Sequence, residues 1–82
     1  MLKSPLTQIR EERGYTRQQL GIVLRVSQPT VSRIEDGFTP IPKKIFAGLI
    51  DLCLKPEEVV KAQDDFMEGI RKELLNKEKI KI

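Results

Sequence analysis

The stretch Thr16–Gly37 constrains the fold of this chain most, because it predicts two short amphipathic helices joined by a tight turn. Thr16 followed three residues later by Gln19 matches a capping box, which begins a helix. Apolar residues then recur at helical spacing on both sides of a turn at residues 25–27, and Gly37 ends the second helix. Aromatic residues are few and tryptophan is absent, so aliphatic packing between helices must supply most of the stability.

The segments on either side of this pair also have helical patterns. Ser4 and Pro5 begin a first helix, the apolar run that starts at Lys43 predicts a buried fourth helix, and Pro56 begins a fifth. We expect the tail KEKIKI to be frayed, and no stretch predicts a strand, a repeat or a linker. The predicted fold is therefore all-α with five helices. It forms a single domain over residues 1–82, with a core at about 6–60 and an extended C-terminal helix at about 56–76.

The composition argues against an enzyme and against a metal or cofactor site. The chain has no histidine and one cysteine, which removes the usual general base, the usual zinc cluster and any internal disulfide. Cys53 lies in the apolar run IFAGLIDLCL, so we expect a small buried hydrophobic side chain in a reducing cytoplasm. No segment predicts a membrane span or a signal peptide, and we expect a soluble, cytoplasmic protein.

The positive charge lies in one half of the chain. Residues 1–44 hold eight Lys and Arg against four Asp and Glu, whereas residues 45–82 hold seven against eight. The net charge of +4 therefore coincides with the half that contains the two-helix unit, as expected if this half faces a polyanion such as DNA.

The second helix of the unit has a polar outer face. With Val31 and Ile34 inward, helical periodicity places five residues outward: Gln28, Pro29, Thr30, Ser32 and Arg33. Short polar side chains with one arginine suit the edges of DNA bases. In a major groove, the amide of Gln28 can bind adenine and the guanidinium of Arg33 can bind guanine. The alternative is that these side chains are simply solvated.

The motif VSQPTVSRIEDG, with Leu20 and Gly21 upstream, resembles the phage repressor and Cro-like helix-turn-helix family of DNA-binding regulators over roughly residues 6–60. The resemblance implies five α-helices, of which the second and third form the DNA-reading unit. The chain departs from the family at two positions. Arg25 replaces the usual glycine of the turn, and Gly21 stands where alanine is commoner.

The resemblance also implies contacts to the DNA backbone and one internal ion pair. Arg17 begins the second helix, where the family usually meets a phosphate, and Lys43 and Lys44 follow the loop that commonly meets a second stretch of backbone. The full set of expected backbone contacts is Arg10, Thr16, Arg17, Arg25, Ser27, Lys43 and Lys44. In close phage-repressor relatives the positions of Arg10 and Glu35 form a pair, which predicts a brace between the first and third helices.

The C-terminal helix carries an apolar stripe with two interpretations. Its members are Val60, Phe66, Met67, Ile70 and Leu74. The stripe either packs on the protein's own helices or forms the seam of a homodimer, and we favour the homodimer because paired half-sites strengthen DNA binding.

The sequence therefore predicts a sequence-specific double-stranded DNA-binding transcriptional regulator. We expect a repressor or autoregulator that binds a palindromic operator as a homodimer, within the nucleoid and without a small-molecule ligand. Two alternatives stay open. An antitoxin would use the C-terminal helix to grip a toxin, and a protein-interaction adaptor would use the same fold without DNA.

Overall fold

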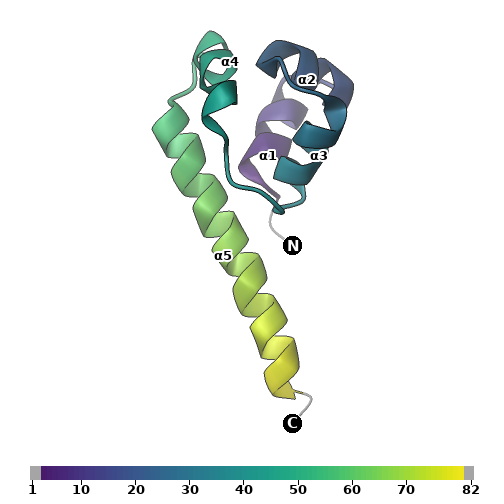
Figure 1. Ribbon diagram of the computed structural model, residues 1–82, viewed down its shortest axis with the longest axis vertical. Helices are drawn as coiled ribbons and strands as arrows, with labels where there is room; N and C mark the ends of the chain where they lie inside the picture. The colour runs from purple at the N-terminus through teal and green to yellow at the C-terminus, as the bar shows by residue number, and fades with distance from the viewer. Residues whose placement is uncertain (1–2, 81–82) are drawn as a thin grey trace.

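The computed structural model describes residues 3–80, and over this range the chain forms helices and no strands (Figure 1). The all-α prediction with five α-helices is confirmed. The helices are α1 (Pro5–Glu12), α2 (Arg17–Leu24), α3 (Gln28–Glu35), a 3-10 turn η1 (Lys43–Ile45), α4 (Phe46–Asp51) and α5 (Pro56–Ile80). None of the helices in this range is both long and apolar enough to cross a bilayer.

The N-terminal caps that the sequence predicts are present on α1 and α2. The hydroxyl of Ser4 accepts a hydrogen bond from the N–H of Thr7 at 3.2 Å, with Pro5 at the first helical position. Thr16 and Gln19 form the reciprocal capping box, with bonds of 2.9 and 3.1 Å. These side chains satisfy N–H groups that lack partners in the first helical turn, which fixes where both helices begin.

Each of the first four α-helices ends in a Schellman motif. In this motif a left-handed residue follows the helix and the next N–H bonds back across the last turn. After α4, for example, Leu54 N–H donates to the Leu49 carbonyl at 3.0 Å. The four left-handed residues have φ between 61° and 80°, and they are Gly14, Arg25, Gly37 and Cys53.

Two predictions for the fourth helix are wrong. The helix is shorter than expected, because a 3-10 turn precedes it and the left-handed Cys53 ends it at Asp51. Cys53 is exposed and not buried. A left-handed residue after a helix no longer follows the helical periodicity, so the apolar run around it does not place its side chain in the core.

The C-terminal helix extends further than the sequence indicated. The helix α5 continues through Gly69 to Ile80, so the first residues of the tail expected to be frayed are helical, whereas residues 81–82 lie outside the described range. An ion pair between Arg71 and Glu68, at 3.3 Å and three residues apart, supports the exposed part of this helix. Gly69 is tolerated because one glycine costs a helix only about 1 kcal/mol.

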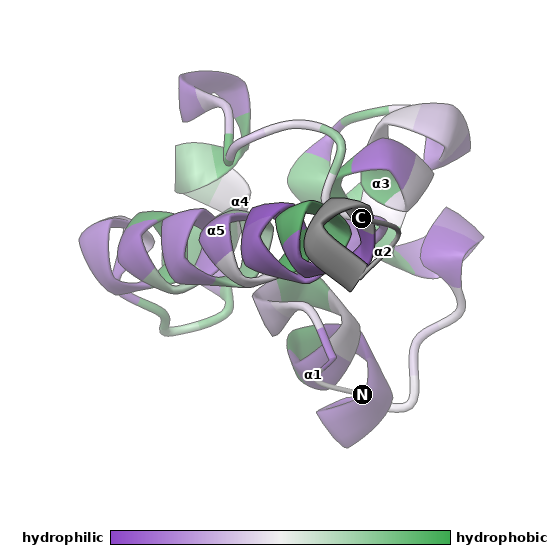
Figure 2. Ribbon diagram, turned by 90° about the horizontal axis from the view of Figure 1, so that it is seen from below, coloured by the Kyte–Doolittle hydropathy of each residue, from purple (hydrophilic) through white to green (hydrophobic). Residues whose placement is uncertain are grey.

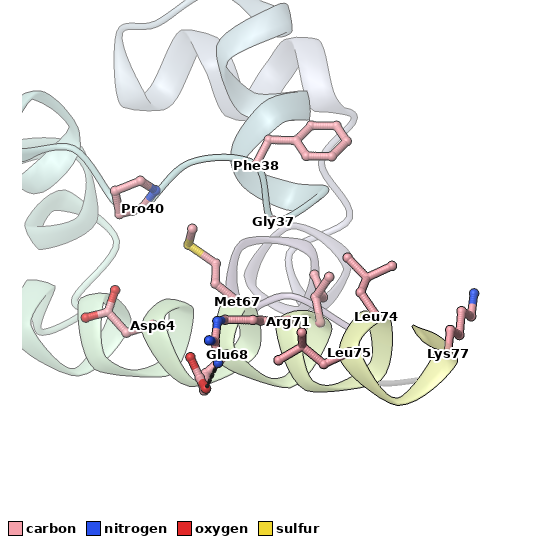
Figure 3. Close-up of a pocket in the computed structure, with 11 residues that line it drawn as sticks. Gly37, Phe38, Pro40, Asp64, Met67, Glu68, Arg71, Leu74, Leu75 and Lys77 are labelled. Carbon is pink, nitrogen blue, oxygen red and sulfur yellow. Dashed lines mark hydrogen bonds and ion pairs between the residues drawn. The ribbon is translucent and has the colours of Figure 1, made fainter. Parts of the chain in front are cut away.

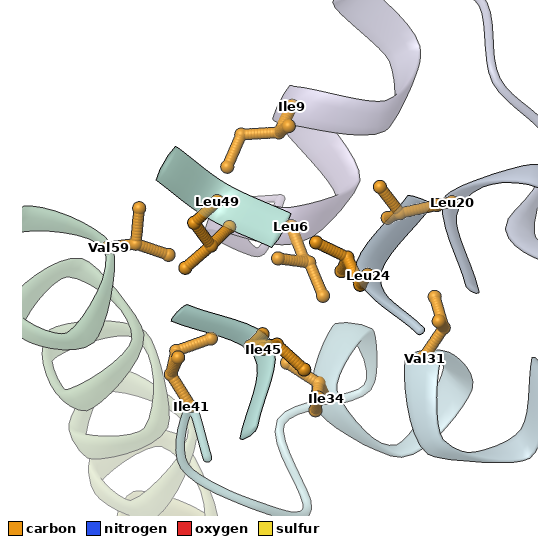
Figure 4. Packing of buried hydrophobic residues seen from close by; sticks show 10 residues of the cluster. All are labelled: Leu6, Ile9, Leu20, Leu24, Val31, Ile34, Ile41, Ile45, Leu49 and Val59. Atoms are coloured by element: carbon orange, nitrogen blue, oxygen red, sulfur yellow. The ribbon is translucent and has the colours of Figure 1, made fainter. Parts of the chain in front are cut away.

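The core is formed by aliphatic side chains from all five α-helices, from η1 and from the loop before η1 (Figure 4). It comprises Leu6, Ile9, Leu20, Leu24, Val31, Ile34, Ile41, Ile45, Leu49 and Val59. Two glycines allow the helices around it to approach closely. A Cβ on Gly21 would lie 2.7 Å from the Val26 carbonyl oxygen, and one on Gly48 would lie 3.0 Å from the Val23 carbonyl oxygen.

The first half of α5 packs on the other helices, and the second half extends beyond them (Figure 1). Hydrophobic and hydrophilic residues alternate along α5 (Figure 2). Gln63 is fully buried, and its Nε2 donates to the carbonyls of Ile34 at 2.9 Å and Thr39 at 3.0 Å. Ile70 lies directly on Gly37, where an added Cβ would be 2.5 Å from its Cδ1. Together these contacts fix α5 to the C-terminal end of α3.

Candidate nucleic-acid interface

The outer face of α3 is polar. Gln28, Pro29 and Arg33 are exposed, whereas Thr30 and Ser32 are half-buried. The opposite face buries Val31, Ile34 and Glu35 against the rest of the protein. The structure thus places together on one helix the five residues proposed to contact bases, with Thr30 and Ser32 nearer the edges of the face.

The N-terminal end of α3 has free hydrogen-bonding capacity. Ser27 takes the N-cap position, with φ −73° and ψ 158°, but its side chain makes no capping bond. Its hydroxyl instead lies 3.0 Å from the hydroxyl of Thr30. The uncapped N–H groups and the helix dipole make this end favourable for an anion such as a phosphate.

The turn between α2 and α3 has left-handed geometry at Arg25, with φ 61° and ψ 40°. A residue with a Cβ costs roughly 1–2 kcal/mol in this region of the Ramachandran plot, where glycine costs nothing comparable. The turn therefore keeps the shape that a glycine would adopt, although the residue differs. Arg25 and Ser27 are exposed in this turn, which connects α2 to the N-terminal end of α3.

Glu35 connects α1 to α3 at the inner side of the interface. Its side chain is 1% exposed, and that of Arg10 is 18% exposed. The Nε of Arg10 lies 3.1 Å from Glu35 Oε2, so the predicted pair is present, and the hydroxyl of Thr7 donates to Oε1 at 2.8 Å. A buried carboxylate needs such partners because an unpaired charge is costly in a low-dielectric interior.

Arg17 turns toward α3, and its guanidinium contacts three residues there. Nη1 donates to the Ser32 hydroxyl at 3.2 Å, Nε lies 3.6 Å from Glu35 Oε1, and Nη2 lies 3.8 Å from Asp36 Oδ1. The side chain remains 39% exposed. The two acids at the end of α3 are thereby accompanied by the guanidinium groups of Arg10 and Arg17, which offsets negative charge next to the polar face.

The other expected backbone contacts differ in how free their side chains are. Arg10 is held internally, since its Nη1 also donates to the Tyr15 carbonyl at 3.2 Å. The Thr16 hydroxyl is occupied by the capping box. Lys43 and Lys44 are exposed on η1 and are the freer candidates.

Comparison with known proteins agrees with this architecture. The model of a family described as helix-turn-helix domain matches residues 5–63. The chain belongs to this helix-turn-helix domain family. Its structure is also similar to the crystal structure of the clp gene regulator ClgR from Corynebacterium glutamicum, with a TM-score of 0.59 and 22% sequence identity over 87% of this chain and 79% of that chain. At this identity the likeness supports the fold alone. No curated protein shows a significant sequence match.

In this helix-turn-helix domain the apolar stripe of α5 is divided between two environments. Val60 packs against the core, and Phe66 and Ile70 lie against Gly37 of the same chain. Met67 and Leu74 line an open groove between α5 and the loop after α3, and Ile70 borders this groove as well. Only part of the stripe proposed for a dimer is therefore available to a second chain.

Sequence reasoning missed four residues in or beside the helix-turn-helix unit: Thr7, Asp36, Phe38 and Gln63. Thr7 lies three residues before Arg10, on the same helix face, and this spacing could have indicated a shared partner. Phe38 is 75% exposed next to the α5 groove. An aromatic residue directly after the end of a helix does not by itself indicate an exposed position beside a groove. The burial of Gln63 depends on the crossing of α5 with α3, which no local pattern reveals.

Proposed function

We propose that this protein is a sequence-specific double-stranded DNA-binding transcriptional regulator of the phage repressor and Cro-like type. The observation that carries the proposal is the exposed polar face of α3, with an uncapped N-terminal end and acids that lie beside arginines. A helix with this surface suits the major groove, because its amide and guanidinium groups match the donors and acceptors of base edges. Membership of the helix-turn-helix domain family supports the same function.

The proposed mode of binding uses α3 for base recognition and its surroundings for phosphates. Gln28 reads adenine and Arg33 reads guanine, while Pro29, Thr30 and Ser32 complete the face. Four exposed side chains, Arg25, Ser27, Lys43 and Lys44, meet the backbone on either side. Binding to an operator then represses transcription by excluding polymerase, since α3 occupies the groove at that site.

Selection of bound DNA from a random pool, followed by footprinting at two salt concentrations, tests this function. We expect one enriched sequence and an affinity that falls steeply with salt. Arg33→Met should relax the preference at one base position, because a bidentate arginine–guanine contact gives about 1–3 kcal/mol of discrimination. Arg13→Met is the matched control, since Arg13 binds the Leu52 carbonyl outside the proposed face. No enriched sequence, or an unchanged sequence with Arg33→Met, would contradict the proposal.

We propose further that two copies pair antiparallel through the exposed side of α5, with the crossing centred between Met67 and Leu74. Met67 and Leu74 extend from α5 toward the side of the groove that Phe38 and Pro40 form (Figure 3). The charges along α5 suit an antiparallel pair. Residues 56–69 have a net charge of −4 and residues 70–77 a net charge of +2, so each half would face the opposite charge of a second copy. A dimer of this kind suits a palindromic operator.

The oligomeric state of two matched variants tests the pairing. Leu74 and Ile50 are similarly exposed, at 57% and 59%, but only Leu74 lines the groove. Leu74→Lys should shift the protein from dimer to monomer in sedimentation or light scattering, whereas Ile50→Lys should leave the dimer intact. A wild-type monomer, or equal effects of the two variants, would exclude pairing through this groove.

A further inference from the structure

We propose that Arg17 is a specificity-determining residue that positions Ser32 and fixes the direction of its hydrogen bond to a base. The sequence resemblance implies that Arg17 meets the DNA backbone, but in the structure its side chain lies along α3. The proposal rests on the proposed DNA-binding function and assigns a role within that interface.

Two carboxylates hold the Arg17 guanidinium in place. Nε lies 3.6 Å from Glu35 Oε1 and Nη2 lies 3.8 Å from Asp36 Oδ1. The Glu35 side chain is 1% exposed and is fixed from α1 by Arg10 and Thr7. If Arg17 moved away to a phosphate, it would lose both attractions, and Asp36 would lose its ion-pair partner at the end of the DNA-facing helix. A guanidinium placed by a nearly buried acid is thus preorganised.

The third contact of the guanidinium determines what Ser32 offers to DNA. Nη1 donates to the Ser32 hydroxyl oxygen at 3.2 Å, so this oxygen already acts as an acceptor. A serine hydroxyl has one O–H donor and two acceptor lone pairs, and a bond to a cation strengthens it as a donor. The positive charge beside the oxygen also disfavours the approach of a second N–H group. Ser32 therefore presents an O–H donor to the groove.

Because Ser32 presents an O–H donor, it should prefer a base that offers a hydrogen-bond acceptor. In the major groove guanine, adenine and thymine each present an acceptor, whereas cytosine presents only an N–H donor. The base next to Ser32 should therefore be one of the first three, and cytosine should be disfavoured by about two- to tenfold, the effect of one neutral hydrogen bond.

Selection from a random DNA pool with the full chain and its variants distinguishes positioning from a phosphate contact. Ser32→Ala should lose the preference at one base position, and Arg17→Met should lose it at the same position and admit cytosine there. The double variant should resemble either single variant, because both changes remove one interaction. Arg17→Lys should also lose the preference, since a lysine lacks the guanidinium fork that reaches the hydroxyl and both acids together, yet it keeps the positive charge and the salt dependence.

A purely phosphate-binding arginine gives different results. Arg17→Met would then weaken binding uniformly across sequences, would lower the salt slope by about one unit and would add to Ser32→Ala. That outcome overturns the proposal, as does an unchanged selected sequence with Ser32→Ala. Failure of the wild type to enrich any sequence would instead refute the DNA-binding function itself. Far-UV circular dichroism of each variant verifies that the fold is retained.

Discussion

Replacing Gly21 by alanine should destabilise the protein, although alanine is the better helix former. Removing a glycine from a helix interior contributes about 1 kcal/mol of stability. At position 21, however, the new Cβ would lie 2.7 Å from the Val26 carbonyl oxygen. A comfortable carbon–oxygen contact is about 3.3 Å, so the turn must move by roughly 0.6 Å. Overpacking of this kind costs about 1–3 kcal/mol, and a net loss of about 1 kcal/mol follows.

Gly69 provides the matched control within a helix of the same protein. Nothing lies within 4 Å of a Cβ built on Gly69, which is exposed on α5. Gly69→Ala should therefore gain the full propensity term of about 1 kcal/mol without a clash. The two substitutions are chemically identical, and their difference isolates the close approach of the turn to α2.

Thermal unfolding at one fixed protein concentration measures both effects. A change of 1 kcal/mol shifts the unfolding midpoint by about 4–8 °C in a domain of this size. Gly21→Ala should therefore lower the midpoint and Gly69→Ala should raise it, with a difference of about 10 °C between the two variants. The concentration is held fixed because association would otherwise change the midpoint. A Gly21→Ala variant as stable as Gly69→Ala would refute the argument that a close helix–turn contact requires glycine here.

Three further substitutions test other parts of the structure by urea unfolding. Arg10→Met should lower the free energy of unfolding by about 3 kcal/mol, because it leaves the Glu35 carboxylate buried without its main partner. Arg33→Met is the control and should change it by less than about 0.5 kcal/mol. Equal effects of the two substitutions would contradict the brace between α1 and α3. Arg25→Gly should add about 1 kcal/mol by relieving the left-handed backbone, while DNA titrations should show a salt slope lower by about one unit. Gln63→Leu should cost about 2 kcal/mol because two carbonyls lose their donor, and a neutral effect would show that Gln63 does not clamp α5.

The sequence alone determined the helical elements and where most of them begin and end. The Ser4 cap, the Thr16–Gln19 capping box and the stops at Gly14 and Gly37 involve residues within a few positions of one another. Local geometry of this kind is encoded by neighbouring side chains, and helical periodicity then separates inner from outer faces. For this reason the sequence also predicted the polar face of α3. The Arg10–Glu35 pair came from resemblance to a family and not from periodicity.

Only the tertiary structure decided how the helices meet and what the charged side chains do there. The carboxylates of Glu35 and Asp36 turn Arg17 toward α3, although the family resemblance implied a phosphate contact. Gln63 is buried because α5 crosses the end of α3, and Cys53 is exposed because a left-handed residue interrupts an apolar run. Each outcome depends on partners that are distant in sequence or on one backbone dihedral angle that helical periodicity does not predict. Helix boundaries and helix faces can therefore be predicted from the sequence, whereas the direction of a long, charged side chain is set by the fold that surrounds it.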